Sequence, residues 1–437
     1  MEFTDLQIAF SAMGILLVLI ALRLPVGFAL FIVAVGGVTA LKGWDVAAGM
    51  IRNEPFDFAA HWSFSAIPMF LLMGAVAHNS GISTSLFYAA RCWFGALPGG
   101  LAVATNFACA GFAAASGSST ATAAALGKIS VPEMSKAGYD VGLSSGTVAS
   151  AGTLGAMIPP SIAFVLYGIF AEVSISKLFI AGVLPGLLTA AIYALMIIVR
   201  CQINPSLGPP LEVKMSFIEK LIALKDVWPL LVLIVAIIGG LYGGLVTPTE
   251  AGAFGAFVAV VISFLQGRMN LRVLKDSVLE ALSGTAKIFW VAIGAVMLTR
   301  FLAMAGAEEF LKDLVGSWAA EPLLLVLAAS LIYIVLGMFL DPLGVLLLSL
   351  PLLLPMFEAL DLNLIWFGVL VVKYIEIGLL TPPVGLNVYV IKSVVGSDVS
   401  LETIFKGVGW FLVCEVFVVL LLVFFPQISL FLPSMMQ

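Results

Sequence analysis

The chain has 437 residues, of which 62% are hydrophobic and only 10% are charged. This composition excludes a water-soluble globular domain and predicts an all-α integral membrane protein, because helices pair their own backbone groups inside a lipid bilayer. The net charge of −5 offers no basic surface for nucleic acid, and the four cysteines stand singly, which excludes a cysteine-based metal or redox motif.

The first half of the chain, residues 1–200, is predicted to form one structural unit. Two spans at about 6–24 and 25–41 are followed by a charged amphipathic segment near 45–60, a third span near 64–80 and a last span near 177–200. Between the third and last spans, a re-entrant hairpin is expected at about 98–134, because Ser116-Gly-Ser-Ser-Thr120 interrupts an apolar stretch. A helix broken at Pro159-Pro160 is expected at about 138–171.

Residues 201–228 are predicted to connect two such units. Ser216 and Glu219 have the spacing of a capping box, and Phe217, Leu221 and Leu224 fall on one face of the helix that would follow. A short amphipathic helix lying in the membrane interface fits this pattern.

The second unit, residues 229–437, is predicted to follow the same plan. Spans are expected near 229–246, 248–266, 287–305 and 403–425, with a charged amphipathic segment near 270–285. Asp341-Pro-Leu-Gly344 interrupts a second hairpin at about 322–358, and Pro382-Pro383 breaks a helix at about 363–396.

The spacing of the prolines indicates a duplication. Pro382 follows Pro159 by 223 residues, and the same interval separates Pro248 from Pro25. If the hairpins do not cross the membrane, each repeat has five spans, and an odd number inverts the second copy relative to the first. The expected fold is therefore two inverted-topology repeats with about ten transmembrane helices, two re-entrant helical hairpins and interfacial arm helices. The positive-inside rule places the connector in the cytoplasm, and it places the acidic start at Glu2 and Asp5 outside.

The two hairpins and the two broken helices are the candidate binding site. Residues 116–120 form the densest hydroxyl cluster of the chain, and a helix start with free amides suits a carboxylate, although small residues also serve tight helix packing. Proline supplies no amide donor, so the carbonyls of residues 155–158 and 378–381 are expected to be free to coordinate a cation. Asn387 would either bind a polar ligand or cap the helix after the break.

Ionisable residues at membrane depth are costly and are usually functional or paired. Asp341 and Glu376 are therefore candidates for cation attraction or structural pairing, and Glu250 is expected to cap a helix start. We expect three further charged residues to lie at the membrane interface, with their stems reaching toward the headgroups: Arg300, Lys373 and Glu415.

Enzyme motifs are not supported. Gly142-Leu-Ser-Ser-Gly146 matches the nucleophile-elbow pattern, but both histidines precede it and no acid followed by a histidine comes after it. No phosphate-binding glycine motif for ATP is present in the sequence either. The sequence therefore predicts a protein that is not an enzyme and draws its energy from an ion gradient or from another subunit.

Four motifs in order resemble the large membrane subunit, the DctM type, of tripartite ATP-independent periplasmic (TRAP) transporters. They are Ser116-Gly-Ser-Ser-Thr-Ala-Thr122, Ile158-Pro-Pro-Ser161, Thr247-Pro-Thr-Glu-Ala-Gly-Ala253 and Leu380-Thr-Pro-Pro-Val-Gly-Leu-Asn387. The resemblance runs over essentially the whole chain. It implies a multi-pass protein of the bacterial inner membrane that imports a carboxylate solute by an elevator mechanism coupled to Na⁺.

The resemblance also implies partners and ligands. The partners are a small four-helix membrane subunit and a soluble periplasmic substrate-binding protein, and the solute is a C4-dicarboxylate, a sialic acid or another sugar or keto acid. One Na⁺ is expected at Ser118, Ser119, Gly155, Ile158 and Pro160, and a second at Gly344, Gly378, Thr381 and Pro383. The solute is predicted to bind at Ser116, Gly117, Ser119, Thr120, Ser161 and Asn387.

Other functions remain open at this point. A stand-alone ion-coupled carrier or a channel for organic anions would use the same helix breaks. A membrane-embedded hydrolase would use Ser118 or Ser144 as its nucleophile, although the sequence offers no plausible base for it.

Overall fold

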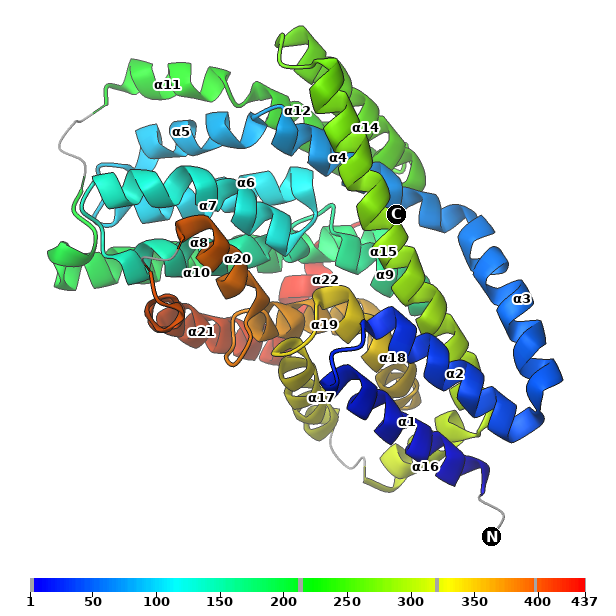
Figure 1. Ribbon diagram of the computed structural model, residues 1–437. Helices are drawn as coiled ribbons and strands as arrows, with labels where there is room; N and C mark the ends of the chain where they lie inside the picture. Colours follow the sequence, from blue (N-terminus) through cyan, green and yellow to red (C-terminus); the bar gives the residue numbers. More distant parts are fainter. Residues whose placement is uncertain (1–3, 211–214, 319–321, 397–398, 437) are drawn as a thin grey trace.

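The computed structural model describes residues 4–210, 215–318, 322–396 and 399–436. Within these ranges the chain is helical and contains no strand, which confirms the all-α prediction (Figure 1). Five helices are long and apolar enough to cross a membrane singly, and three bent helix pairs meet the same test. Glu2 and residues 211–214 of the predicted connector lie outside the described residues.

The helices of the first half begin with five that precede the hairpin: α1 (Asp5–Ala21), α2 (Val26–Lys42), α3 (Trp44–Ala60), α4 (Ala66–Asn79) and α5 (Ile82–Phe94). The hairpin consists of α6 (Gly100–Ser116) and α7 (Ser119–Lys136). The broken helix consists of α8 (Val141–Met157) and α9 (Ile162–Phe170), and α10 (Ile175–Ile203) closes the half.

The second half repeats this order after the connector helix α11 (Phe217–Lys225). Its first helices are α12 (Trp228–Ile234), α13 (Gly240–Tyr242), α14 (Pro248–Leu265), α15 (Leu271–Met304) and α16 (Ala307–Trp318). The second hairpin is α17 (Pro322–Gly337) with α18 (Pro342–Ala359), and the second broken helix is α19 (Leu364–Gly378) with α20 (Leu386–Val395). The chain ends with α21 (Leu401–Phe424) and α22 (Gln427–Ser434).

Equivalent helices begin at equivalent caps. The second hairpin arms, α7 and α18, have Ser118 and Asp341 as their N-caps, and these residues are separated by the 223-residue interval. The same interval relates Asp140, which caps α8, to Asn363, which caps α19. Side-chain oxygens at these positions accept the first free amides of each helix, so the duplication fixes where both hairpins and both broken helices start.

The repeats differ before the hairpins. In the first half, α3 (Trp44–Ala60) and the helical segment Trp62–Asn79, which contains α4, are two pieces that meet at a bend of 59°. In the second half, the single helix α15 runs through 34 residues without interruption. The charged segment at 270–285 therefore belongs to the same helix as the third predicted span of the second half. Pro68 lies in the first turn of α4 and α15 contains no proline, which explains why only the first copy starts a new helix there. Helices at the positions of α5 and α16 were not predicted.

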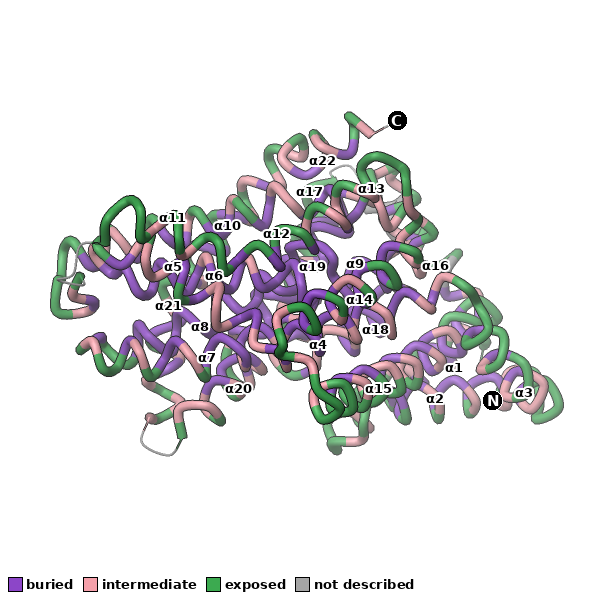
Figure 2. Tube along the Cα trace, turned by 90° about the horizontal axis from the view of Figure 1, so that it is seen from above, coloured by how far each residue is buried: buried purple, intermediate pink, exposed green. Residues whose placement is uncertain are grey.

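The two halves pack against each other through the helices that carry the candidate site. The first arm of broken helix 1, α8, lies against α21 of the second half, and α20 packs on α7 and α8. Figure 2 shows buried residues concentrated on these central helices, and α8 is buried at every position from Gly142 to Met157. Neither broken helix is a surface helix facing lipid along its length.

The connector helix forms as predicted. Ser216 accepts a hydrogen bond from the Glu219 amide, and the Glu219 carboxylate accepts one from the Ser216 amide. None of the residues in α11 is buried. The helix lies on α5, with Lys220 over the ring of Trp93.

Candidate binding site at two helix breaks

The tip of the first hairpin packs directly on the first helix break. A Cβ atom at Gly155 would stand 2.5 Å from the Ser118 carbonyl oxygen and 2.6 Å from Thr122 Oγ1. A Cβ atom at Gly117 would stand 2.7 Å from the Pro160 carbonyl oxygen. The two backbones therefore approach as closely as only glycine allows, and the sequence motifs around residues 118 and 158 meet in space.

Oxygen atoms gather where these backbones meet. The Ser116 and Thr122 hydroxyls are 2.6 Å apart, and the Ser119 hydroxyl donates to the Thr153 carbonyl oxygen over 3.5 Å. The residues four positions after Gly155 and Ala156 are prolines, so the carbonyls of both have no helical amide to accept. Thr122 was not among the predicted ligands, although the motif that carried the prediction includes it.

The structure thus brings the five predicted residues of the first Na⁺ site into one region. Residues 158–161 are all buried, and Ile162 donates its amide to the Gly117 carbonyl oxygen over 3.3 Å. Ser161 caps α9 by accepting the Phe164 amide at 3.4 Å. A cluster of carbonyl and hydroxyl oxygens without a carboxylate is a donor set that suits a hard monovalent cation.

The second break is built differently. A Cβ atom at Gly378 would stand 2.6 Å from the Gly337 Cα atom, so the end of α17 touches the end of α19. The Gly378 carbonyl accepts the Thr381 amide over 3.1 Å, and the Leu379 carbonyl accepts the Asn387 amide over 3.2 Å. Of the carbonyls at residues 378–381 that were expected to be free, those of Gly378 and Leu379 are therefore paired, because the turn after α19 supplies replacement donors.

Several oxygens of the second break remain suited to a cation. Each carbonyl oxygen has a second lone pair, and the Thr381 hydroxyl lies 2.6 Å from the Ile377 carbonyl oxygen. Pro382 and Pro383 are exposed, in contrast to the buried first break. The sequence analysis did not predict the contact of Gly337 with Gly378, and no motif around Gly337 in the sequence indicates it.

Gly344 lies apart from the contact between Gly337 and Gly378. Its amide donates to the Asp341 carboxylate over 3.3 Å, and a Cβ atom there would stand 3.3 Å from Val26 of α2. Asp341 also accepts the Leu343 amide at 3.2 Å, so its carboxylate caps α18. Glu250 likewise caps α14 together with Thr247, as expected.

The predicted solute-binding residues divide between the two halves. Ser116, Gly117, Ser119 and Thr120 lie at the first hairpin tip, with Thr120 Oγ1 3.3 Å from Ser118 Oγ. Asn387 is fully buried at the start of α20, and its amide donates to the Ala149 carbonyl oxygen of α8 over 3.1 Å. Asn387 does not cap α20, whose N-cap is Gly385. It links the second break to the first broken helix.

Lys373 and Glu415 are not interfacial, which corrects the sequence prediction. Both side chains are fully buried, and Lys373 Nζ lies 2.9 Å from Glu376 Oε2 and 2.8 Å from Glu415 Oε2. The ammonium group also donates to Thr189 Oγ1 over 3.0 Å, and the Tyr193 hydroxyl donates to Glu415. The network joins α19, one turn before the break, to α10 and α21, the last long helix of each repeat.

Arg300, the third residue expected at the interface, has a side chain that is 55% exposed and pairs with Glu54 over 2.9 Å. The hydrolase alternative finds no support in the geometry of Ser144. Its hydroxyl donates to the Asp140 carbonyl oxygen of its own helix over 2.8 Å, and the residue is buried.

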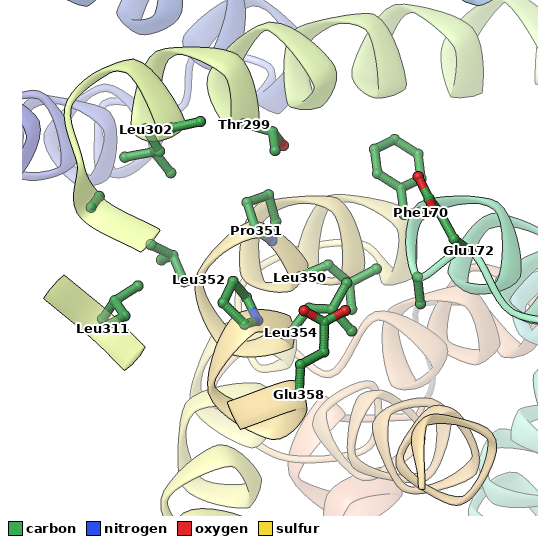
Figure 3. A pocket seen from close by; sticks show the side chains of 14 residues that line it. Phe170, Glu172, Thr299, Leu302, Leu311, Leu350, Pro351, Leu352, Leu354 and Glu358 are labelled. Atoms are coloured by element: carbon green, nitrogen blue, oxygen red, sulfur yellow. The ribbon is translucent and has the colours of Figure 1, made fainter. Parts of the chain in front are cut away.

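A cavity of about 340 Å³ lies away from both breaks, between α9, α18 and the turn from α15 to α16. Figure 3 shows Glu358 on α18 and Glu172 after α9 among the side chains that line it, with Thr299 on the opposite wall. Two carboxylates would repel an anionic solute, so this cavity is not the place where a carboxylate would bind.

Comparison with known proteins gives matches over nearly the whole chain. The family model described as "Tripartite ATP-independent periplasmic transporter, DctM component" matches residues 13–428. The chain is 35% identical to the C4-dicarboxylate TRAP transporter large permease protein DctM of Pseudomonas aeruginosa, over 91% of this chain and 92% of that protein. It is 31% identical to the sialic acid TRAP transporter permease protein SiaT of Haemophilus influenzae, over 98% of this chain and 68% of that protein.

One further relative and one solved structure are also similar to this chain. The isethionate TRAP transporter permease protein DctMQ of Oleidesulfovibrio alaskensis is 33% identical over 92% of this chain, which spans 65% of that longer protein. Among solved structures, the YdaH transporter of Alcanivorax borkumensis superposes with a TM-score of 0.65, covering 90% of this chain and 89% of that one at 14% identity. That likeness concerns the fold alone.

The apolar multi-pass helices, the paired hairpins and broken helices, and a family match over nearly the whole length lead to one conclusion. This chain belongs to the DctM family, the large permease component of tripartite ATP-independent periplasmic transporters, and is a multi-pass protein of the bacterial inner membrane.

Proposed function

We propose that the chain imports an organic anion, most simply a carboxylate, by secondary active transport coupled to Na⁺. One Na⁺ binds where the first hairpin tip meets the first break, and another binds at the second break near Gly378 and Thr381. The observation that carries the proposal is the close approach of Gly155 to Ser118, since it leaves carbonyl and hydroxyl oxygens around a buried gap in helical hydrogen bonding.

The chemistry of the solute is proposed from the hydroxyl cluster and from the relatives. Ser116, Thr120 and the free amides at the start of α7 suit an anionic group at a positive helix end. The relatives are named for C4-dicarboxylates, sialic acid and isethionate, each of which carries at least one anionic group. Neither the hydroxyls nor Asn387 selects among these anions.

The moving part of the transporter is proposed to contain both hairpins and both broken helices. Support comes from the packing of α20, in the second broken helix, on α7 of the first hairpin and α8 of the first broken helix. These contacts join elements of the two repeats, so the two breaks would move together as one body in an elevator-type cycle. The remaining helices, among them α2 packed along α15, would form the scaffold.

The partners are proposed to be a small four-helix membrane subunit and a soluble periplasmic substrate-binding protein. Uptake into proteoliposomes tests both the coupling and the partners. With both partners present and an inward Na⁺ gradient, a labelled C4-dicarboxylate, sialic acid or isethionate is expected to accumulate, and collapsing the gradient with a Na⁺ ionophore should abolish accumulation.

Two outcomes would change the proposal. Accumulation that persists in choline or K⁺ buffer without any Na⁺ would overturn the coupling. Accumulation by the chain alone, without either partner, would instead identify a stand-alone carrier, and rapid equilibration without accumulation would identify a channel.

A further inference from the structure

A large cavity lies between the second hairpin and the scaffold. Its volume is about 1010 Å³. The end of α1 with the start of α2 forms one wall, α15 forms another, and the third comes from the end of α17, the start of α18 and Val384 of the second break. The cavity therefore touches both a proposed moving element and the helices proposed to stay fixed.

The lining is apolar apart from three charged residues, Arg23, Lys287 and Asp341. Asp341 accepts two backbone amides as the cap of α18, so its carboxylate is already engaged. Neither Arg23 nor Lys287 forms an ion pair with any carboxylate in the described part of the chain. The two cations outnumber the single carboxylate in the lining, so the cavity carries a net positive charge that attracts an anionic group.

Arg23 and Lys287 lie at the same height along the parallel helices α2 and α15. Helices α2 and α15 run side by side in the same direction. The ring centroids of Phe28 and Trp290 lie 4.9 Å apart, and nine residues further along α2 a Cβ atom at Gly37 would stand 2.4 Å from the Phe301 ring. Arg23 stands just before α2, and Lys287 stands one turn before Trp290. This level lies at the end of α1 opposite to the acidic start, and the positive-inside rule assigns it to the cytoplasmic side.

We propose that this cavity binds an anionic phospholipid of the cytoplasmic leaflet. The phosphate group lies between Arg23 and Lys287, and an acyl chain follows the apolar wall toward Phe339. The side chains of Leu17, Phe28 and Phe339 are 54%, 48% and 59% exposed, so the apolar wall continues onto the outer surface where lipid lies. Basic pockets between transmembrane helices on the cytoplasmic side are suited to such headgroups.

A soluble solute fits this cavity less well than a lipid. A dicarboxylate could pair with the two cations, but it would leave the apolar walls uncovered, whereas a phospholipid satisfies both the charges and the walls. Because Leu340, Leu343 and Val384 line the same cavity, the lipid also contacts the second hairpin and the second break.

The test measures lipid binding to the purified, delipidated chain in detergent by native mass spectrometry. Phosphatidylglycerol is compared with phosphatidylcholine of the same acyl chains, and the anionic lipid is expected to bind at least tenfold more tightly. The double variant Arg23→Gln with Lys287→Gln should lose most of this preference. Arg272→Gln with Lys275→Gln, on the exposed start of α15, is the matched control and should keep it.

A second variant separates the cavity from the charges. Val335→Trp leaves both cations in place but fills the cavity, and it is expected to weaken binding of phosphatidylglycerol by a similar factor. Equal binding of the two lipids, an unchanged preference in the Arg23 and Lys287 double variant, or displacement of the lipid by soluble succinate would each overturn the proposal. The measurement needs neither Na⁺ nor partners, so its failure would leave the proposed transport function untouched.

Discussion

Gly155 and Ser118 approach so closely that a single methyl group at residue 155 would overlap the Ser118 carbonyl oxygen, at 2.5 Å. Because the obstacle is backbone, the methyl group can be accommodated only by moving the hairpin tip away from the break. Overpacking of this kind costs about 1–3 kcal/mol.

Gly155→Ala is expected to raise the Na⁺ concentration for half-maximal uptake by about tenfold, since each 1.4 kcal/mol corresponds to a factor of about ten in affinity. Uptake at increasing Na⁺, at constant ionic strength, measures the shift. Gly409→Ala is the matched control, because a Cβ atom at Gly409 meets no atom within 4 Å. An unchanged Na⁺ dependence in Gly155→Ala would remove the first site from the account.

Thr381 tests the second break. Thr381→Val keeps the shape of the side chain but removes the hydroxyl that donates to the Ile377 carbonyl oxygen. The Na⁺ concentration for half-maximal uptake is expected to rise roughly three- to tenfold, as for one lost hydrogen bond. Thr381→Ser retains the hydroxyl and should behave nearly as the wild type. The same uptake titration decides, and equal effects of Val and Ser would show that the hydroxyl plays no part.

The buried network around Lys373 makes a prediction about stability. Lys373→Met leaves the Glu376 and Glu415 carboxylates buried without a cation, and removal of one partner of a buried pair costs about 3–5 kcal/mol. The melting temperature of the purified variant should therefore fall sharply. The triple variant with Glu376→Gln and Glu415→Gln carries no buried charge and should regain most of the loss. If the triple variant melts as low as Lys373→Met, the cost does not arise from unpaired charge.

The two breaks differ in exposure, and thiol labelling can measure the difference. In a background in which the four native cysteines are replaced, Val384→Cys, which is half-buried and follows the exposed Pro383, should react with a membrane-impermeant maleimide in detergent. Ile158→Cys should react far more slowly, because Ile158 is only 8% exposed. Equal labelling rates at both positions would contradict the closed first break and the open second break.

The sequence was sufficient to predict the elements that carry the site. The recurrence of Pro159-Pro160 at Pro382-Pro383 located both broken helices, and the interruptions at residues 116–120 and 341–344 located both hairpins within a few residues. These features are local and covalent, since proline and glycine act on the backbone wherever they stand. The apolar composition fixed the all-α membrane class for a similar reason.

What the sequence did not reveal depends on contacts between distant segments. Lys373 and Glu415 are 42 residues apart, and only the packing of α19 on α21 and α10 shows that they are buried partners rather than interfacial residues. The replacement donors for the Gly378 and Leu379 carbonyls arise from the path of the turn that follows α19. The contact of Gly337 could not be predicted from the sequence, because this glycine acts only by letting the backbone at Gly378 approach.

The most direct test of the central claim, that the two breaks bind Na⁺, is the melting temperature of the purified chain in NaCl against KCl at equal ionic strength. A ligand at about 100 times its Kd stabilises the folded state by about 2.7 kcal/mol, so Na⁺ should raise the melting temperature clearly above the value in K⁺. The double variant Gly155→Ala with Thr381→Val should lose this difference while Gly409→Ala retains it. Identical melting in Na⁺ and K⁺ for the wild type, or a Na⁺ response that survives in the double variant, would contradict the account.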